Sequence, residues 1–149
     1  SEWENSFYAD KLPADQLNAK WWALCKQYQG MAPPTTRGEN YLDPATKTYI
    51  NDDPAQYYDY ALSYVILFQL HDHIAKNILH QDPHATNYYG NKEVGEFLRD
   101  IMRPGSSRDW RVVLKEKTGE DLSARAMIDY FQPLMTYLKA QNKGRKYTM

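Results

Sequence analysis

Residues 53–79 read DPAQYYDYALSYVILFQLHDHIAKNIL, and this segment says most about how the chain folds. Asp53 followed by Pro54 is typical of a helix start, because aspartate caps a first turn and proline is tolerated at the first helical position. The pattern predicts one long helix from Asp53 to about Leu79, with aromatic side chains on one face and aliphatic ones on the others. A helix that is apolar nearly all round is normally buried on several sides.

The rest of the chain is also predicted to be helical. Four further helices are indicated by proline or capping residues at their starts, apolar residues at helical spacing, and glycine or proline after their ends. They cover residues 13–30, residues 94–103, a stretch from Ser107 or Asp109 to Gly119, and a last helix capped by Ser123 with a kink at Pro133. A long loop follows Gly30, and only residues 47–50 in it suggest a short extended piece. Residues 1–149 are therefore predicted to be a single all-α domain, or a fragment, of about five helices.

Charge and composition exclude several classes of protein. Eighteen basic and nineteen acidic side chains give a formal net charge of -1, so a nucleic-acid partner is not expected. The longest apolar run, Ala61–Leu70, is half of the roughly 20 residues that a membrane span needs, so no membrane span is expected. The first residues have neither the charged start nor the apolar stretch of a signal peptide, so these residues do not encode a compartment.

Histidine and cysteine positions argue against a metal site or a nucleophile in this chain. His71 and His73 are two apart on a predicted helix and point about 160° away from each other. His80 and His84 have the spacing of an HExxH motif, but glutamine replaces its glutamate and a proline interrupts the helix. Cys25 has no neighbouring histidine and no CxxC partner. No metal ligand is therefore assigned.

Lysine and tyrosine side chains before and within the long helix are the candidate functional groups. Lys47 is a cation that can hold a carboxylate. Tyr57, Tyr60 and Tyr64 recur at helical spacing, and their hydroxyls can donate to an oxyanion. The same pattern also suits a solvated surface lysine and a tyrosine stripe that packs in a core or an interface. Residue types alone leave both interpretations open.

Six short motifs follow one another along nearly all of the chain. They are residues 18–30 (NAKWWALCKQYQG) with Pro33-Pro34 after them, Lys47-x-x-Ile50, Tyr57-x-x-Tyr60, residues 68–72 (FQLHD), Lys92-Glu93-x-Gly95, and residues 123–134 (SARAMIDYFQPL). None of them is as specific as HExxH, but all six in this order are hard to obtain by chance. In this order the sequence resembles the angiotensin-converting-enzyme family of zinc dipeptidyl carboxypeptidases.

The resemblance implies that the chain is the C-terminal portion of a larger helical, zincin-like metallopeptidase that releases dipeptides from peptide C-termini. Zinc would be held by the family's HExxH helix and a downstream glutamate in the N-terminal part of the same enzyme, outside this chain. An extracytoplasmic location, periplasmic or secreted, would follow. Lys47 and Tyr57 match residues that bind the free C-terminal carboxylate of a peptide substrate, Tyr60 matches the catalytic oxyanion donor, and Tyr64 would line a pocket for the substrate's primed side.

Some positions depart from the family pattern. Tyr49 stands where the family usually has a histidine that donates to a substrate carbonyl, and we expect Tyr49 to bind substrate in its place. Asp59 stands where an arginine commonly binds an activating chloride, so chloride is not expected as a cofactor. Ala75 and Asn87 replace a disulfide of animal members, which is consistent with a bacterial homologue.

A function of a different class is a non-catalytic helical module that grips a protein or peptide with its tyrosine face. The binding-module hypothesis also predicts that the chain has no metal ligands. An HExxH motif encoded upstream of Ser1 would distinguish the peptidase from the module.

Overall fold

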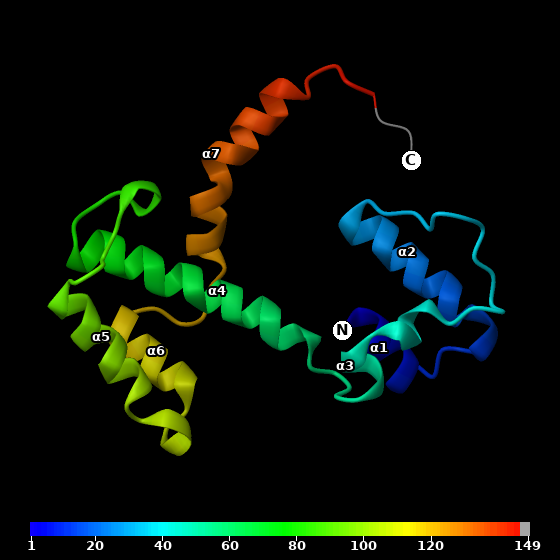
Figure 1. Cartoon of the computed structure of the whole chain (residues 1–149), viewed down its shortest axis with the longest axis horizontal. Coiled ribbons are helices and arrows are strands. Elements are labelled where there is room, and N and C mark those ends of the chain that lie inside the picture. Colours follow the sequence, from blue (N-terminus) through cyan, green and yellow to red (C-terminus); the bar gives the residue numbers. More distant parts are fainter. Residues whose placement is uncertain (147–149) are drawn as a thin grey trace. The chain divides into compact units, whose positions relative to one another are not determined.

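In the computed structural model, which describes residues 1–146, no strand occurs in the described range and every regular element is helical (Figure 1). The α-helices of this range are α1 (Glu2–Tyr8), α2 (Leu17–Gln29), α3 (Thr48–Asn51), α4 (Tyr57–His73), α5 (Lys92–Met102), α6 (Trp110–Thr118) and α7 (Arg125–Gln141). The predicted all-α class is confirmed. The predicted number of about five is too low because α1 and α3 are too short to show several periods of apolar residues.

The helices fall into two compact units. The first contains residues 1–60 with Arg145 and Lys146, and the second contains residues 61–144. Helix α4 begins in the first unit and continues into the second.

Trp3 of α1 anchors the first unit. Its buried ring stacks on Phe7 with the ring centroids 5.3 Å apart and meets Trp21 of α2 edge-on at 6.4 Å. The indole N–H of Trp3 donates to the carbonyl of Leu17 over 2.9 Å, so the polar edge of this buried ring is satisfied. Helix α2 ends as predicted at Gly30, whose φ of 64° is the left-handed conformation that stops a helix.

The second unit has its own core. A π-helical turn (Ile74–Ile78) extends α4 and packs near α5, and the buried apolar side chains are Ile74, Ala75, Val94, Val113, Leu114 and Ala126. Gln69 of α4 is the buried polar residue of this unit. Its amide donates to the carbonyl of Asp121 and accepts from the backbone N–H of Ser123, at 2.9 and 3.2 Å, and so joins α4 to the segment before α7.

Most predicted helix ends in this unit agree with the structure. Asp109 rather than Ser107 caps α6, because its carboxylate accepts from the N–H of Arg111 at 2.9 Å, and Gly119 ends the helix with φ 80°. Helix α5 stops two residues before Pro104. Helix α7 starts at Arg125 with Ala124, not the predicted Ser123, at its N-cap position. The hydroxyl of Ser123 still accepts from the N–H of Arg125 at 3.2 Å, just before the helix.

Two predictions for the segment before α4 are wrong. The helix does not begin after Asp53 but at Tyr57, because Ala55 has a positive φ of 63° and the chain turns there. Residues 47–50 are not an extended piece. Only Lys47 is extended, with φ -97° and ψ 126°, and residues from Thr48 to Asn51 form α3.

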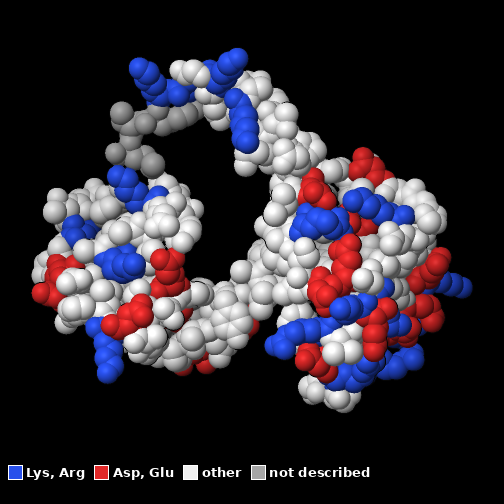
Figure 2. All heavy atoms as spheres, turned by 180° about the vertical axis from the view of Figure 1, so that it is seen from behind, with Lys and Arg blue, Asp and Glu red and all other residues white. Residues whose placement is uncertain are grey.

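Helix α4 is also less buried than its composition predicts. Tyr60, Tyr64 and Leu67 are 52%, 59% and 54% exposed. Within the described residues no helix combines the length and the apolar character needed to cross a membrane. On the face shown in Figure 2, charged side chains cluster over the second unit and at the C-terminal end of α7, whereas the middle of α7 carries few.

Candidate substrate-binding site

A pocket of about 610 Å³ lies within the first unit. Three indole rings, those of Trp3, Trp21 and Trp22, form much of its wall, and Lys47 and Tyr57 line it as well. A concave site with mostly apolar walls and a few polar groups is the usual form of a ligand site. The structure therefore brings the two residues expected to bind a carboxylate to one pocket.

The backbone of Lys47 is held on both sides. Its N–H donates to the carbonyl of Pro44 at 3.1 Å, and its carbonyl accepts from the N–H of Ile50 at 3.0 Å. Both Pro44 and Ile50 are buried, so the backbone of Lys47 is attached to packed residues. The Lys47 side chain is exposed, and among residues 1–146 it makes no ion pair. Its ammonium group can therefore take a carboxylate from outside the chain.

A polar network holds the segment that leads to Lys47 on helix α2. The backbone N–H of Asp43 donates to the fully buried Asn18 at 2.8 Å, and the Asp43 carboxylate accepts from the indole N–H of Trp22 at 2.8 Å. The guanidinium of Arg37 pairs with the same carboxylate. The hydrogen bonds from Arg37 and then Trp22 hold the pKa of Asp43 well below its usual range. Sequence reasoning missed this network, although an aspartate before a proline in a long loop could have indicated it.

Three tyrosines form a cluster beside the pocket, which we call the tyrosine cluster: Tyr49, Tyr57 and Tyr60. The hydroxyls of Tyr49 and Tyr60 are hydrogen-bonded at 2.7 Å. The ring of Tyr49 meets that of Tyr57 edge-on at 5.0 Å and lies 5.6 Å from that of Tyr60. The hydrogen bond to Tyr60 raises the pKa of Tyr49. Tyr64, one helical turn after Tyr60 on α4, belongs to the second unit and is not part of this cluster.

Glu4 is a further residue that sequence reasoning missed. Its side chain is only 3% exposed, and one carboxylate oxygen accepts from the backbone N–H of Ala55 at 2.6 Å. The two residues are 51 positions apart, so no local pattern could show the contact. This hydrogen bond holds the turn at Ala55. The turn sets where α4 starts, and so it sets the positions of Tyr57 and Tyr60.

Cys25 is buried and lines the pocket. Burial raises the pKa of its thiol, and the charge of Lys47 opposes this in part. A thiol whose pKa is raised is a poor nucleophile at neutral pH. Asp59 is exposed in the first turn of α4, and within residues 1–146 it makes no ion pair.

The histidines are engaged in other contacts. His71 Nε2 lies 2.8 Å from the carbonyl oxygen of Pro83, and the ring of His73 stacks on Phe97 at 5.1 Å. No three His, Cys, Asp or Glu side chains of the described residues lie close enough together to hold a metal ion. The part of the chain that the structure describes therefore does not fit a zinc ion.

Comparison with known proteins identifies the family. The family model described as angiotensin-converting enzyme, Peptidase M2, matches residues 1–149. The angiotensin-converting enzyme of Bos taurus is 35% identical over 144 residues, which are 95% of this chain and 11% of that protein. The angiotensin-converting enzyme-like protein Ace3 of Mus musculus is 40% identical over 129 residues, 84% of this chain and 17% of that protein. An angiotensin-converting enzyme of Theromyzon tessulatum is 33% identical over 139 residues, 91% of this chain and 22% of that protein.

This chain thus spans about a tenth to a fifth of the length of these relatives. The match covers the pocket, the tyrosine cluster and the helices of both units. The chain belongs to the angiotensin-converting-enzyme family.

Proposed function

We propose that this chain is the C-terminal portion of a zinc peptidyl-dipeptidase, and that it binds the C-terminal carboxylate of a peptide substrate and stabilises the oxyanion formed during hydrolysis. The observation that carries this proposal is that Lys47 and Tyr57 line one pocket. Family membership supplies the reaction class, since the relatives are named for peptide conversion.

Lys47 binds the substrate's carboxylate in this proposal. Its backbone is fixed by hydrogen bonds to Pro44 and Ile50. The side chain therefore starts from a fixed backbone position, while its methylene groups can rotate to bring the ammonium group to the carboxylate. The Tyr57 hydroxyl donates a second hydrogen bond to the same carboxylate. A cation together with a neutral donor favours a free C-terminal acid over an amide, because only the acid carries the charge.

Tyr60 donates to the oxyanion of the tetrahedral intermediate. A preorganised donor aimed at developing charge contributes to the rate because its hydrogen bond strengthens in the transition state. Tyr49 binds substrate within the tyrosine cluster. For Tyr64, which belongs to the second unit, a role on the primed side is proposed from the family resemblance alone.

Zinc is proposed for the full-length enzyme only. The described residues do not supply a ligand group, so the metal would be held by the N-terminal part of the same enzyme. That part is the partner expected to cover the exposed tyrosine side of α4. An extracytoplasmic location is proposed on the family alone, and chloride is not proposed as a cofactor.

The test uses the full-length enzyme with paired substrates that differ only at the C-terminus, one a free acid and the other an amide. Lys47→Ala should raise KM for the free acid by about 10- to 100-fold, the usual loss for a hydrogen bond to a charged group. It should change KM for the amide far less. Lys26→Ala is the matched control, because Lys26 is an exposed lysine of α2 outside the pocket lining, and it should change neither value.

Equal losses on both substrates would remove Lys47 from the carboxylate site. Loss of activity with a parallel loss of folded protein, followed by circular dichroism, would be a stability effect. Lys47→Arg then separates a loss of carboxylate binding from a loss of stability. It keeps the positive charge, so it should retain the preference for the free acid.

The non-catalytic binding module is the second candidate, and the exposed tyrosines of α4 favour it. It predicts that a full-length protein binds peptides without hydrolysing them. Detection of a released dipeptide by mass spectrometry decides between the two functions.

A further inference from the structure

The pocket of the first unit has more carboxylates than cations among its lining side chains. The charged side chains that line it are Glu2, Glu4, Asp43 and Lys47. Glu2 accepts from the hydroxyl of Tyr28 at 2.7 Å, and Glu4 accepts from the backbone N–H of Ala55 at 2.6 Å. A carboxylate of the chain competes with a substrate's carboxylate for the one lysine. The pocket therefore binds an external carboxylate well only if its own carboxylates are held by other partners.

Asp43 is the competitor that lies nearest to Lys47 along the chain. It begins the 3-10 turn Asp43–Thr46, and Lys47 follows that turn directly. Lysine carries its ammonium group on a flexible stem of four carbons, so the group can swing toward a carboxylate four residues away. The ordinary pKa of an aspartate is about 3.9, so Asp43 is charged near neutral pH whether or not it is paired.

Arg37 holds both carboxylate oxygens of Asp43. Its Nε–H donates to Oδ2 at 3.1 Å, and its Nη2 donates to Oδ1. Two parallel hydrogen bonds of this kind are among the strongest that an arginine makes. The side chains of Arg37 and Asp43 are only 27% and 16% exposed, so water screens this pair less than a pair on the open surface. The ring of Tyr41, whose centroid is 3.5 Å from the guanidinium carbon, holds Arg37 from one face.

Arg37 does not itself line the pocket. It therefore neutralises Asp43 without placing its own charge where a substrate binds. Trp22 donates to the same carboxylate at 2.8 Å, but an indole is neutral and cannot replace the charge of Arg37. Within the described residues Lys47 makes no ion pair, which is the state that carboxylate binding requires.

We propose that Arg37 is a positioning residue for Lys47, because its pairing with Asp43 leaves the Lys47 ammonium group available to the C-terminal carboxylate of a peptide. This inference rests on the proposed role of Lys47 in carboxylate binding. Without Arg37, the Asp43 carboxylate is an unpaired charge in a partly buried place, and Lys47 moves to pair with it. A substrate's carboxylate then has to displace an internal one.

The test measures binding of the dipeptide alanyl-phenylalanine and of its C-terminal amide to the full-length enzyme by isothermal titration calorimetry. Arg37→Gln should raise Kd for the free acid about three- to tenfold, the size expected for competition by one partly screened ion pair. It should change Kd for the amide by less than about twofold, because the amide carries no charge for Lys47 to bind. Arg108→Gln is the matched control. It breaks an exposed ion pair with Glu116 in the second unit and should change neither value.

The double variant Arg37→Gln/Asp43→Asn separates competition between charges from damage to the structure. Asparagine keeps an acceptor for the indole N–H of Trp22 but carries no charge. The double variant should therefore bind the free acid within about twofold of wild type, and Asp43→Asn alone should bind it at least as tightly as wild type. A purely structural role predicts the opposite order, because the double variant lacks both partners of the ion pair. A double variant as weak as Arg37→Gln would overturn the inference, and so would equal losses for the acid and the amide.

Circular dichroism checks that each variant is folded. If Arg37→Gln does not fold, Arg37→Lys and Asp43→Asn decide the matter. Arg37→Lys keeps a positive charge beside Asp43 without the two-pronged contact, so its Kd for the free acid should stay within about threefold of wild type. Weaker binding of the free acid by Asp43→Asn, with amide binding intact, would overturn the inference.

Lys47→Ala in the same assay separates this inference from the proposed function. If Lys47→Ala binds the acid and the amide as wild type does, the proposed carboxylate site fails, and the role of Arg37 fails with it. If Lys47→Ala loses acid binding selectively but Arg37→Gln does not, the proposed function stands and the inference fails. Arg37→Gln/Lys47→Ala should bind the free acid no more weakly than Lys47→Ala, because Arg37 acts only through Lys47.

Discussion

Ala55 adopts a left-handed backbone conformation, with φ 63°, that a residue with a Cβ rarely adopts. The cost of this conformation is about 1–2 kcal/mol. The structure retains it because the backbone N–H of Ala55 donates to the buried carboxylate of Glu4. One strained residue thus sets where α4 begins.

We predict that Ala55→Gly stabilises the chain. Glycine adopts positive φ without strain but loses more backbone freedom on folding, so the net gain should be about 0.5–1 kcal/mol in the free energy of unfolding. Urea denaturation followed by circular dichroism measures it. Ala23→Gly is the control, because Ala23 is an exposed residue in the middle of α2 and glycine should destabilise the helix there by about 1 kcal/mol. A loss of stability in both variants would contradict strain at Ala55.

We also predict that the full-length enzyme does not respond to chloride. Asp59 places a negative charge on the first turn of α4, and an anion beside it would be repelled. Dipeptide release should differ by less than about twofold between chloride and acetate at matched ionic strength. A several-fold rise that saturates at millimolar chloride would show that another residue supplies a positive charge.

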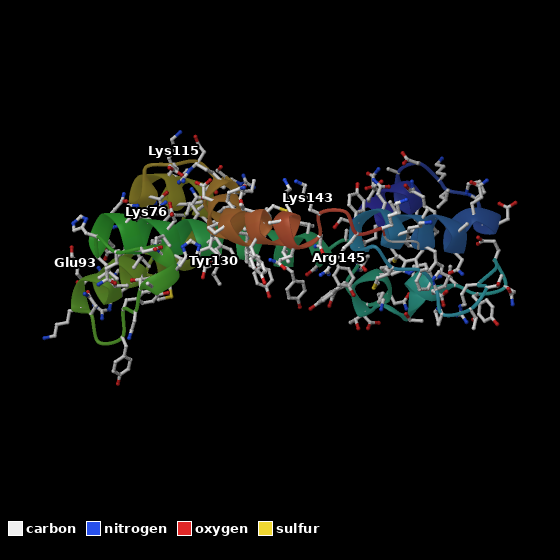
Figure 3. The ribbon with its side chains drawn as sticks, turned by 90° about the horizontal axis from the view of Figure 1, so that it is seen from above. Lys76, Glu93, Lys115, Tyr130, Lys143 and Arg145 are labelled. Atoms are coloured by element: carbon white, nitrogen blue, oxygen red, sulfur yellow. The ribbon has the colours of Figure 1, made fainter. Side chains whose placement is uncertain are left out.

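At the scale of elements, His84 links the 3-10 turn Pro83–Ala85 to helix α7. One ring nitrogen lies 2.9 Å from the carboxylate of Asp82 and the other 2.8 Å from the carbonyl of Tyr130. The His84 ring also stacks on the ring of Tyr130 at 4.3 Å. Tyr130, labelled in Figure 3, lies where α7 passes α4, since its ring centroid is 5.1 Å from that of Phe68. Both ring nitrogens of a histidine are donors only when it is protonated.

This geometry predicts a pH-dependent contribution to stability. The carbonyl of Tyr130 and then the carboxylate of Asp82 raise the pKa of His84 in the folded chain, against smaller opposing effects of desolvation and of the charge of Lys76. A raised pKa in the folded state means that the stabilisation is fully present below the unfolded value of about 6.5 and is lost as pH rises through the folded value. The wild-type chain should therefore have a larger free energy of unfolding than His84→Gln. This difference should be greatest at pH below 6 and smallest in alkaline solution.

Asp82→Asn is the matched variant for that prediction. It keeps an acceptor for the backbone N–H of His84, with which the Asp82 carboxylate bonds at 2.9 Å, but it removes the charge. The pH dependence of stability should shrink in this variant. Equal differences between wild type and His84→Gln at every pH would show that His84 contributes through packing alone.

At the scale of the whole molecule, α7 carries an exposed apolar face. At 100° per residue five side chains fall within about 120° of the helix circumference. They are Ile128, Phe131, Leu134, Met135 and Leu138, each between 41% and 61% exposed. Monomeric proteins seldom expose contiguous apolar patches above a few hundred Å². This face is a surface that the N-terminal part of the proposed enzyme could cover.

We predict that the 149-residue chain self-associates through the apolar face of α7. Sedimentation velocity should show a weight-average sedimentation coefficient that rises with concentration. The double variant Phe131→Lys/Leu138→Lys should reduce the rise, because it places two charges in the middle of the face. Thr136→Lys, on the other side of the same helix, is the control and should leave the rise unchanged. A concentration-independent wild type would contradict the prediction.

The candidate site shows how far the sequence could predict function. Lys47 and Tyr57 were identifiable from residue type and family motif, and the structure brings them to one pocket. Their roles, and those of Tyr49, Tyr60 and Tyr64, stay predictions. The network of Asn18, Asp43 and Arg37 was not identifiable, because its members are spread over 25 positions and each looks like an ordinary loop or helix residue.

The sequence by itself determined the all-α class, the glycine-terminated ends of α2 and α6, and the family, because helical periodicity, left-handed stops and ordered motifs are local properties. Only the tertiary structure decided where α4 begins, that residues from Thr48 form a helix, and that the hydroxyls of Tyr49 and Tyr60 meet. The physical reason is that these features depend on contacts between distant residues. Glu4 acts on Ala55 across 51 positions, and a buried carboxylate that requires a donor outweighs the local preference for a helix start at Asp53.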